Sequence, residues 1–124
     1  MRLDRLVKIA VTALEDIKAR DIVVLNTTKL TSLFDRMIIA SADSSRQTRA
    51  LANNVVEKVK QAGAPVQGIE GEGAAEWILI DLGSVIVHVM QPAVREYYNL
   101  EELWGGSLRH RKAKRFDAEL SRLG

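Results

Sequence analysis

Two short apolar segments separated by only two residues place the strongest limit on what this chain can fold into. Residues 76–81 and 84–90 are rich in β-branched side chains, and Leu82 and Gly83 lie between them. Because Gly83 can adopt the positive φ that a tight turn requires, this pattern predicts an antiparallel β-hairpin. We place its two-residue turn at Leu82 and Gly83.

The two sides of this hairpin differ in chemistry, because successive side chains of a strand point to opposite faces. One side is purely aliphatic and is expected to face a hydrophobic core: Ile78, Ile80, Val85, Val87 and Val89. The other side is mixed and carries Met90 and the pairs Trp77–His88, Leu79–Ile86 and Asp81–Ser84. This mixed side is either a second core layer, with a satisfied buried histidine, or a surface that docks a partner.

The first part of the chain reads as one helix followed by two strands. Apolar residues at 3.6-residue spacing predict a helix over residues 3–18. Short β-branched or continuous apolar runs predict strands over 22–25 and 37–40, with a polar loop over 26–33. The continuous run at 37–40 is typical of a central strand that is covered on both faces.

A second long helix is expected after the strand at 37–40. Asp43 or Ser44 can accept hydrogen bonds from the free N–H groups of its first turn. Its apolar stripe runs to about Ala62, and Gly63 ends it.

The remaining segments complete a mixed fold. Residues 66–76 are rich in glycine and alanine and read as a strand end followed by a loop. Pro92 begins a short helix, and Asn99 can cap a second one that ends near Trp104. The alternation of helices and strands predicts an α/β class, with a mixed β-sheet packed by helices in a single domain over residues 1–106.

Charge is unevenly distributed along the chain. Residues 1–104 carry 12 basic and 14 acidic side chains, whereas residues 105–124 carry 6 and 2, and the formal net charge is +2. The basic tail over residues 107–124 could neutralise RNA phosphates, or it could be a disordered or helical extension. The residues that could contact RNA are Arg109, Arg111, Lys112, Lys114 and Arg115.

Composition limits the chemistry that the chain can perform. It has no cysteine and two histidines, which excludes disulfides and thiolate metal sites and argues against a histidine metal cage. Glu70 and Glu72 could together hold a magnesium ion, although solvated loop acids are the more ordinary interpretation. Because no glycine-rich phosphate-binding fingerprint is present, we expect neither a metal nor a cofactor.

Location can also be inferred from the sequence. No apolar run reaches the 18 residues of a membrane span. The charged start, Met1 to Arg5, leads into an amphipathic pattern and resembles neither a signal peptide nor an organellar leader. We therefore expect a cytoplasmic protein with no membrane contact.

Several long segments resemble the ribosomal silencing factor family, also called RsfS or Iojap. They read MIIASADSSRQ over residues 37–47, GIEG over 68–71, WILIDLGSVIVHVM over 77–90 and REYYNLEELW over 95–104. The resemblance covers about residues 3–104. It implies a fold similar to a nucleotidyltransferase domain, but without known catalysis.

The resemblance also implies a function. Members of this family bind the large ribosomal subunit through the ribosomal protein called L fourteen, prevent joining of the small subunit, and lower translation when nutrients are scarce. Carried onto this chain, the docking residues are Trp77, Asp81, Leu82, Gly83, His88, Met90, Arg95, Tyr97 and Tyr98, to which the mixed hairpin side adds Leu79. Leu82 and Gly83 are expected to form the tip of the docking surface.

Two other functions remain open from the residues themselves. One is a magnesium-dependent nucleotidyltransferase or phosphoryl-transfer enzyme that uses Glu70, Glu72 and Asp81. The other is an RNA-binding module led by the basic tail. An exposed patch around Trp77 could also pair with a second copy, so that the free protein forms a homodimer.

Overall fold

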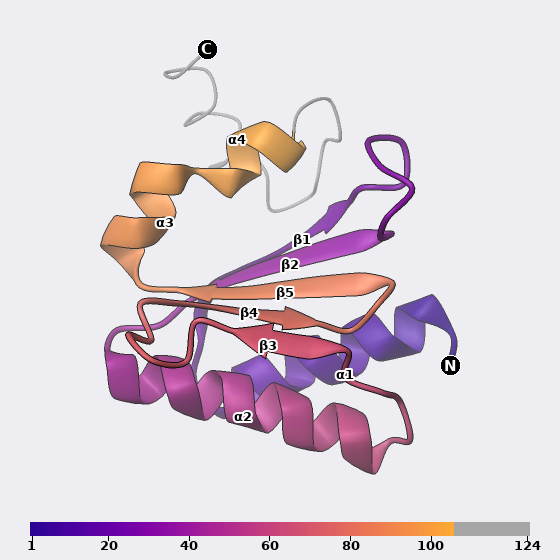
Figure 1. Cartoon of the computed structure of the whole chain (residues 1–124), viewed down its shortest axis with the longest axis horizontal. Helices are drawn as coiled ribbons and strands as arrows, with labels where there is room; N and C mark the ends of the chain where they lie inside the picture. The colour runs from indigo at the N-terminus through magenta and orange to yellow at the C-terminus, as the bar shows by residue number, and fades with distance from the viewer. Residues whose placement is uncertain (106–124) are drawn as a thin grey trace.

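The computed structural model describes residues 1–105, which form a β-sheet with helices on both faces (Figure 1). In chain order the elements are α1 (Leu3–Asp16), β1 (Arg20–Asn26), β2 (Arg36–Ser41), α2 (Ser45–Gln61), β3 (Gly68–Glu70), β4 (Trp77–Asp81), β5 (Val85–Met90), α3 (Pro92–Tyr98) and α4 (Leu100–Gly105). The expected basic tail over residues 107–124 lies outside the described part of the chain.

The sheet is mixed, as predicted. Its strand order is β1-β2-β5-β4-β3. The central pair β2 and β5 is parallel, and every other neighbouring pair is antiparallel. Figure 1 shows α1 and α2 covering one face of the sheet, while α3 and α4 lie across the other face. The prediction of an α/β fold with a mixed sheet packed by helices is therefore confirmed.

The main core lies between the sheet and the pair α1 and α2. Leu14 of α1 and Leu51 and Val55 of α2 are completely buried there. The aliphatic hairpin side packs against them, and each of its five members has no exposed surface: Ile78, Ile80, Val85, Val87 and Val89. The prediction that this side faces the core is confirmed.

The start of α2 follows the predicted capping signal. Of the two candidates, Ser44 is the N-cap, and its hydroxyl accepts a hydrogen bond from the N–H of Gln47 at 3.0 Å. The side-chain oxygen of Gln47 in turn accepts from the N–H of Asp43 at 2.7 Å. One of the N–H groups that a helix start leaves unpaired, that of Gln47, is thus satisfied by the capping side chain, and Gln47 in turn fixes the residue before the cap.

The predicted hairpin turn is wrong by one position. The N–H of Leu82 donates to the carbonyl of Val85 at 2.9 Å, so Gly83 and Ser84 form the turn. Hairpin turns of the favoured types require a positive φ at their first central residue, and Gly83 has a φ of +86° there. With the turn at Leu82 and Gly83, that φ would have fallen on Leu82, whose side chain disfavours it.

This shift corrects the cross-strand pairs but keeps the two faces. Trp77 lies opposite Met90, Leu79 opposite His88 and Asp81 opposite Ile86. The register differs from the predicted one by two residues. Because side chains alternate with a period of two, each residue stays on its predicted side of the sheet.

Candidate functional site

The mixed side of the hairpin is divided into a covered part and an open part. The covered part lies beneath α3 and α4, where Met90 is completely buried and His88 is 5% exposed. Met90 joins a second, smaller core formed by Val23, Leu25, Met37 and Ile39, which Phe34, Val94, Leu100 and Trp104 help to cover. The interpretation as a second core layer is therefore correct for this part of the face.

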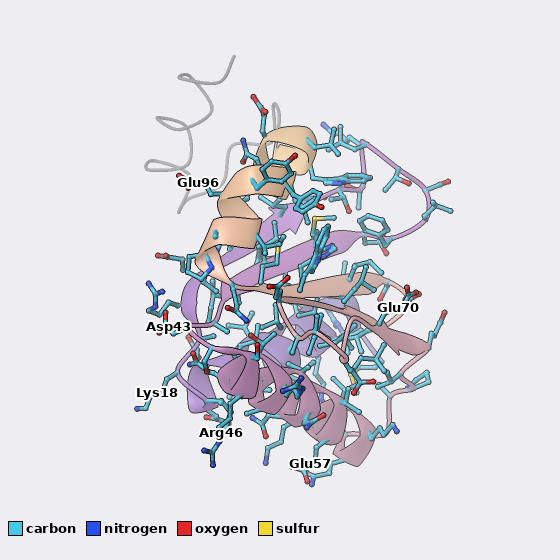
Figure 2. All side chains as sticks on the ribbon, turned by 60° about the vertical axis from the view of Figure 1, so that its left-hand side comes forward. Lys18, Asp43, Arg46, Glu57, Glu70 and Glu96 are labelled. Carbon is cyan, nitrogen blue, oxygen red and sulfur yellow. The ribbon has the colours of Figure 1, made fainter. Side chains whose placement is uncertain are left out.

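The open part of the same face is the region of β3, β4 and β5 that α3 and α4 do not cover. Trp77, Leu79 and Asp81 of β4 and Ile86 of β5 are only partly buried. Glu70 of β3 lies directly opposite Leu79 in the register, so its side chain shares this face. Figure 2 shows Glu70 at the edge of the sheet, away from the helices. We call these five residues the open half.

Trp77 connects the covered and open parts. Its indole Nε1–H donates a hydrogen bond to Nδ1 of His88 at 3.0 Å. Its ring packs against that of Tyr98 in α3, with 4.9 Å between the ring centroids, and Tyr98 contacts Tyr97 edge-on at 5.0 Å. Tyr98 is 55% exposed and Tyr97 is 81% exposed. We call Trp77, Tyr98 and Tyr97 the aromatic row; it continues the open half onto α3.

The burial of His88 determines its protonation state. Burial lowers the pKa of His88 from its ordinary value of 6.5 to about 4. The imidazole is therefore neutral near pH 7, and its Nδ1 is free to accept the indole proton of Trp77. A buried neutral histidine that holds an aromatic side chain in place is well suited to preorganising a docking surface.

The hairpin turn carries three of the predicted docking residues in different environments. The carboxylate of Asp81 accepts the N–H of Gly83 at 2.8 Å and so shapes the turn. Leu82 is 4% exposed and packs into the main core on the opposite side of the sheet. Leu82 therefore does not form an exposed tip, which corrects that expectation. At this end of the hairpin, the backbone of Gly83 is partly accessible.

Arg95 was predicted to contact the partner, but its side chain points into the molecule. It is 9% exposed and forms an ion pair with Glu101 of α4, with 2.8 Å between Nη2 and Oε2. Further hydrogen bonds join it to the carbonyl of Asp21 and the hydroxyl of Ser41. Arg95 and the buried Met90 thus support the surface from below rather than forming part of it.

The acidic pair considered for magnesium lies at the β3 edge. Glu70 ends β3, and Glu72 follows in the loop, where Arg49 of α2 donates to the carbonyl oxygens of Glu72 and Gly73 at 3.2 and 2.7 Å. Within residues 1–105 there is no group of three or more His, Cys, Asp or Glu side chains placed to hold a metal ion. In the structure, Glu70 lies beside Leu79 on the mixed side of the sheet.

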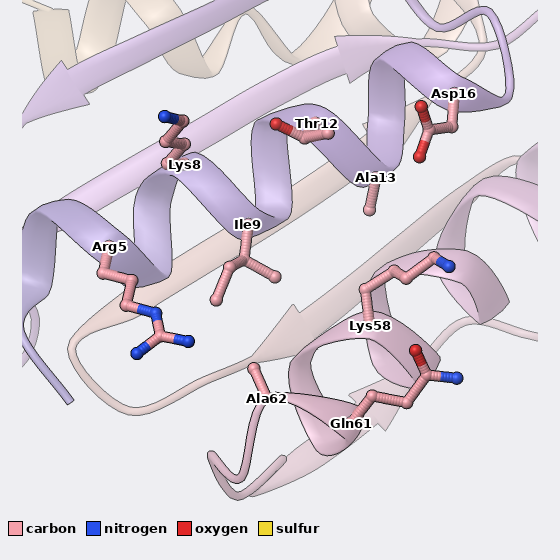
Figure 3. A pocket seen from close by; sticks show the side chains of 9 residues that line it. All are labelled: Arg5, Lys8, Ile9, Thr12, Ala13, Asp16, Lys58, Gln61 and Ala62. Atoms are coloured by element: carbon pink, nitrogen blue, oxygen red, sulfur yellow. The ribbon is translucent and has the colours of Figure 1, made fainter.

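A separate groove lies on the other side of the molecule, between α1 and α2 (Figure 3). It has a volume of about 680 Å³ and is open to solvent. Ile9 and Ala13 lie along it, and Arg5, Lys8 and Lys58 flank it. None of the residues predicted for docking lines this groove.

A sequence model of the family described as "Ribosomal silencing factor during starvation" (RsfS) matches residues 1–122. A protein of Chromobacterium violaceum named ribosomal silencing factor RsfS is 57% identical over 106 residues, covering 86% of this chain and 87% of the relative. The chain belongs to the RsfS family.

The chain is also similar, at lower sequence identity, to proteins of other organisms. The Bacillus subtilis protein of the same name is 38% identical over 100 residues, which is 81% of this chain and 85% of the relative. A mouse protein named "Mitochondrial assembly of ribosomal large subunit protein 1" is 35% identical over 97 residues, 76% of this chain and 42% of the relative. The RsfS family name associates the chain with the ribosome and with the regulation of translation.

Solved structures agree with the RsfS assignment. A crystal structure of a Chromobacterium violaceum protein has a TM-score of 0.84 and 54% identity, covering 92% of this chain and 98% of that one. A Bacillus halodurans structure has a TM-score of 0.75 and 38% identity, covering 82% and 94%. Within residues 1–105, this RsfS-family chain has no helix long and apolar enough to cross a membrane.

Sequence reasoning missed two features of this site. Glu70 was considered only as a metal ligand or a solvated loop acid, because its place on the mixed face depends on the register between β3 and β4. The ion pair of Arg95 with Glu101 was also missed, because it joins two helices across the left-handed Asn99, where the i+3 and i+4 spacing rule of a continuous helix does not apply.

Proposed function

We propose that this chain is a ribosomal silencing factor that binds the large ribosomal subunit through ribosomal protein L fourteen. Bound there, it blocks the joining of the small subunit and lowers translation, chiefly when nutrients are limiting. The observation that carries the docking site is the aromatic row: Trp77 is held by His88, and the exposed rings of Tyr98 and Tyr97 continue it. Rigid, partly exposed aromatic side chains are the residues that most often dominate binding energy at interfaces.

The charge of the open half favours a protein partner over RNA. Glu70 and Asp81 place two carboxylates on this face beside Leu79 and Ile86, while β3, β4 and β5 contain no lysine or arginine. Carboxylates would repel RNA phosphates, whereas they complement the lysine and arginine side chains of a basic protein. This supports a protein surface such as L fourteen as the partner.

We further propose that the chain acts without catalysis or a cofactor and works in the cytoplasm. The similarity to proteins named silencing factors supports a regulator rather than an enzyme. The tail residues Arg109, Arg111, Lys112, Lys114 and Arg115 are the candidates for contact with ribosomal RNA. The partly exposed surface at Trp77 and Leu79 would pair in a homodimer when no ribosome is present.

The test combines binding with subunit joining. The purified protein is sedimented with isolated large and small ribosomal subunits, and the two subunits are then allowed to rejoin in its presence. We expect binding to the large subunit alone and fewer joined ribosomes. Binding to neither subunit would overturn the proposal and would return attention to nucleotide and magnesium binding at Glu70 and Glu72.

The role of the tail has its own experiment. Deleting residues 107–124 should weaken binding to the large subunit and reduce its dependence on salt, because fewer phosphate counterions would be released. An affinity that is unchanged at every salt concentration would dismiss the contact between the tail and RNA while leaving the docking surface intact.

A further inference from the structure

One buried side chain joins four elements of the fold. The guanidinium of Arg95 in α3 donates to both carboxylate oxygens of Glu101 in α4, from Nε at 3.2 Å and from Nη2 at 2.8 Å. Its Nη1 also donates to the carbonyl of Asp21 in β1 and to the hydroxyl of Ser41 in β2, both at 2.8 Å. We call this set of four hydrogen bonds the Arg95 clamp.

The segment that the clamp holds has little intrinsic stability. α3 has 7 residues and α4 has 6, and Asn99 joins them in a left-handed conformation with a φ of +46°. Helices of this length do not persist without tertiary contacts. Their position over the sheet therefore depends on their anchors: the clamp and the partly buried side chains of Val94, Leu100 and Trp104.

The outer surface of this segment forms part of the docking surface. Tyr98 packs on Trp77 with 4.9 Å between the ring centroids, and it lies three residues after Arg95 on α3. A small rotation or translation of α3 would separate the two rings. The orientation of α3 relative to the sheet therefore determines whether Tyr98 contacts Trp77 in the aromatic row.

We propose that Arg95 is a positioning residue of the docking surface, whose clamp to Glu101, Ser41 and Asp21 holds α3 where Tyr98 packs against Trp77. The planar guanidinium binds a carboxylate through two parallel bonds and so specifies direction as well as distance. Buried ion pairs contribute little net stability compared with apolar residues of similar size. The contribution of this pair is therefore to fix the position of α3. This inference rests on the proposed function, because the surface that Arg95 positions is the one assigned to the partner.

The test replaces the charged pair without leaving a lone buried charge. The double variant Arg95→Met/Glu101→Leu removes both charges, while Arg95→Lys keeps the positive charge and loses the forked geometry. Two quantities are measured on the full chain: nuclear Overhauser effects between the rings of Trp77 and Tyr98, and the affinity for purified large ribosomal subunits. We expect both variants to fold, to lose the contacts between the rings and to bind about tenfold more weakly.

A second experiment asks whether Arg95 acts through Tyr98. Tyr98→Ala is introduced into the natural protein and into the double variant, and the two losses of affinity are compared. We expect a clear loss in the natural protein and almost none in the double variant, because its Tyr98 is already displaced. Arg20→Gln/Asp43→Asn serves as the control, since it removes an exposed ion pair whose two residues lie outside α3 and α4, and it should change neither quantity.

The outcomes separate this inference from the proposed function. A folded double variant that keeps the contacts between the rings and the natural affinity would overturn the positioning role. Loss of the fold in both variants would overturn it too, because the clamp would then be an element of stability. If the natural protein does not bind large subunits, the proposed function fails, but the ring contacts still decide whether Arg95 positions Tyr98.

Discussion

The indole Nε1–H of Trp77 and the imidazole Nδ1 of His88 form a hydrogen bond of 3.0 Å on the face of the sheet opposite α1 and α2. Trp77 is partly exposed, whereas His88 is buried and carries a lowered pKa. One member of the pair can therefore meet a partner, while the other fixes its orientation. This division of roles explains why an aromatic side chain at the edge of a core can act as a rigid anchor.

Replacing Trp77 by alanine should strongly weaken docking but preserve the fold. We expect affinity for large subunits to fall about 30-fold or more, as for a binding hot spot, because the ring that Tyr98 packs against in the aromatic row is lost. Stability should fall by about 1–2 kcal/mol, less than the ~3–5 kcal/mol of a fully buried aromatic residue. Sedimentation and urea unfolding measure the two effects.

The matched control for Trp77 is Leu33→Ala. Leu33 is 82% exposed on the connection between β1 and β2, outside the open half and the aromatic row, and its removal should leave binding unchanged. A grossly unfolded Trp77→Ala protein would instead show that Trp77 is mainly a core residue.

Reversing the charge of Glu70 should distinguish a basic protein partner from RNA. If Glu70 faces lysine or arginine side chains, Glu70→Lys should weaken binding to large subunits by about two- to fivefold at low salt. Glu57→Lys makes the same change on the exposed surface of α2 and should have no effect (Figure 2). Tighter binding by Glu70→Lys would indicate that this face meets phosphates.

His88 should make stability depend on pH. Because its folded pKa of about 4 lies below the ordinary 6.5, the unfolded chain binds a proton that the folded chain does not between these values. The stability contributed by neutral His88 is present above pH 6.5 and is lost as the pH falls toward 4, by up to about 3 kcal/mol.

This dependence can be isolated with His88→Gln, which does not titrate. Urea unfolding of both proteins at pH 7 and pH 4.5 cancels the carboxylate effects that they share. The difference in stability between the natural protein and the variant should shrink at the lower pH. An identical pH dependence in both proteins would show that His88 is accessible to protons in the folded state.

Gly83, at the turn of the hairpin, should be sensitive to substitution. Its φ of +86° is unfavourable for any residue with a side chain, so Gly83→Ala should cost about 1 kcal/mol or more. The added Cβ would also lie 2.8 Å from the Nε2 atom of Gln67, although that side-chain end can move. Gly68→Ala is the control, because nothing lies within 4 Å of its Cβ position; equal losses from both substitutions would contradict the role of φ.

Much of the fold follows from local patterns. The aliphatic side of the hairpin was predicted from alternation alone, and the start of α2 from the capping residue Ser44. Even the error in the turn left the two faces of the sheet intact, since the register moved by two residues. Such features depend on neighbouring residues, whose spacing and side-chain chemistry are visible in the sequence.

The site depended on contacts between distant segments. Arg95 meets Ser41 across 54 positions of the chain, and Glu70 lies beside Leu79 only because β3 pairs with β4 in one register. The sequence by itself determined which residues share each face of the hairpin, through the two-residue period of a strand. Only the tertiary structure decided which of them α3 and α4 cover, because that depends on how a short, weakly stable segment is anchored to strands far away in the chain.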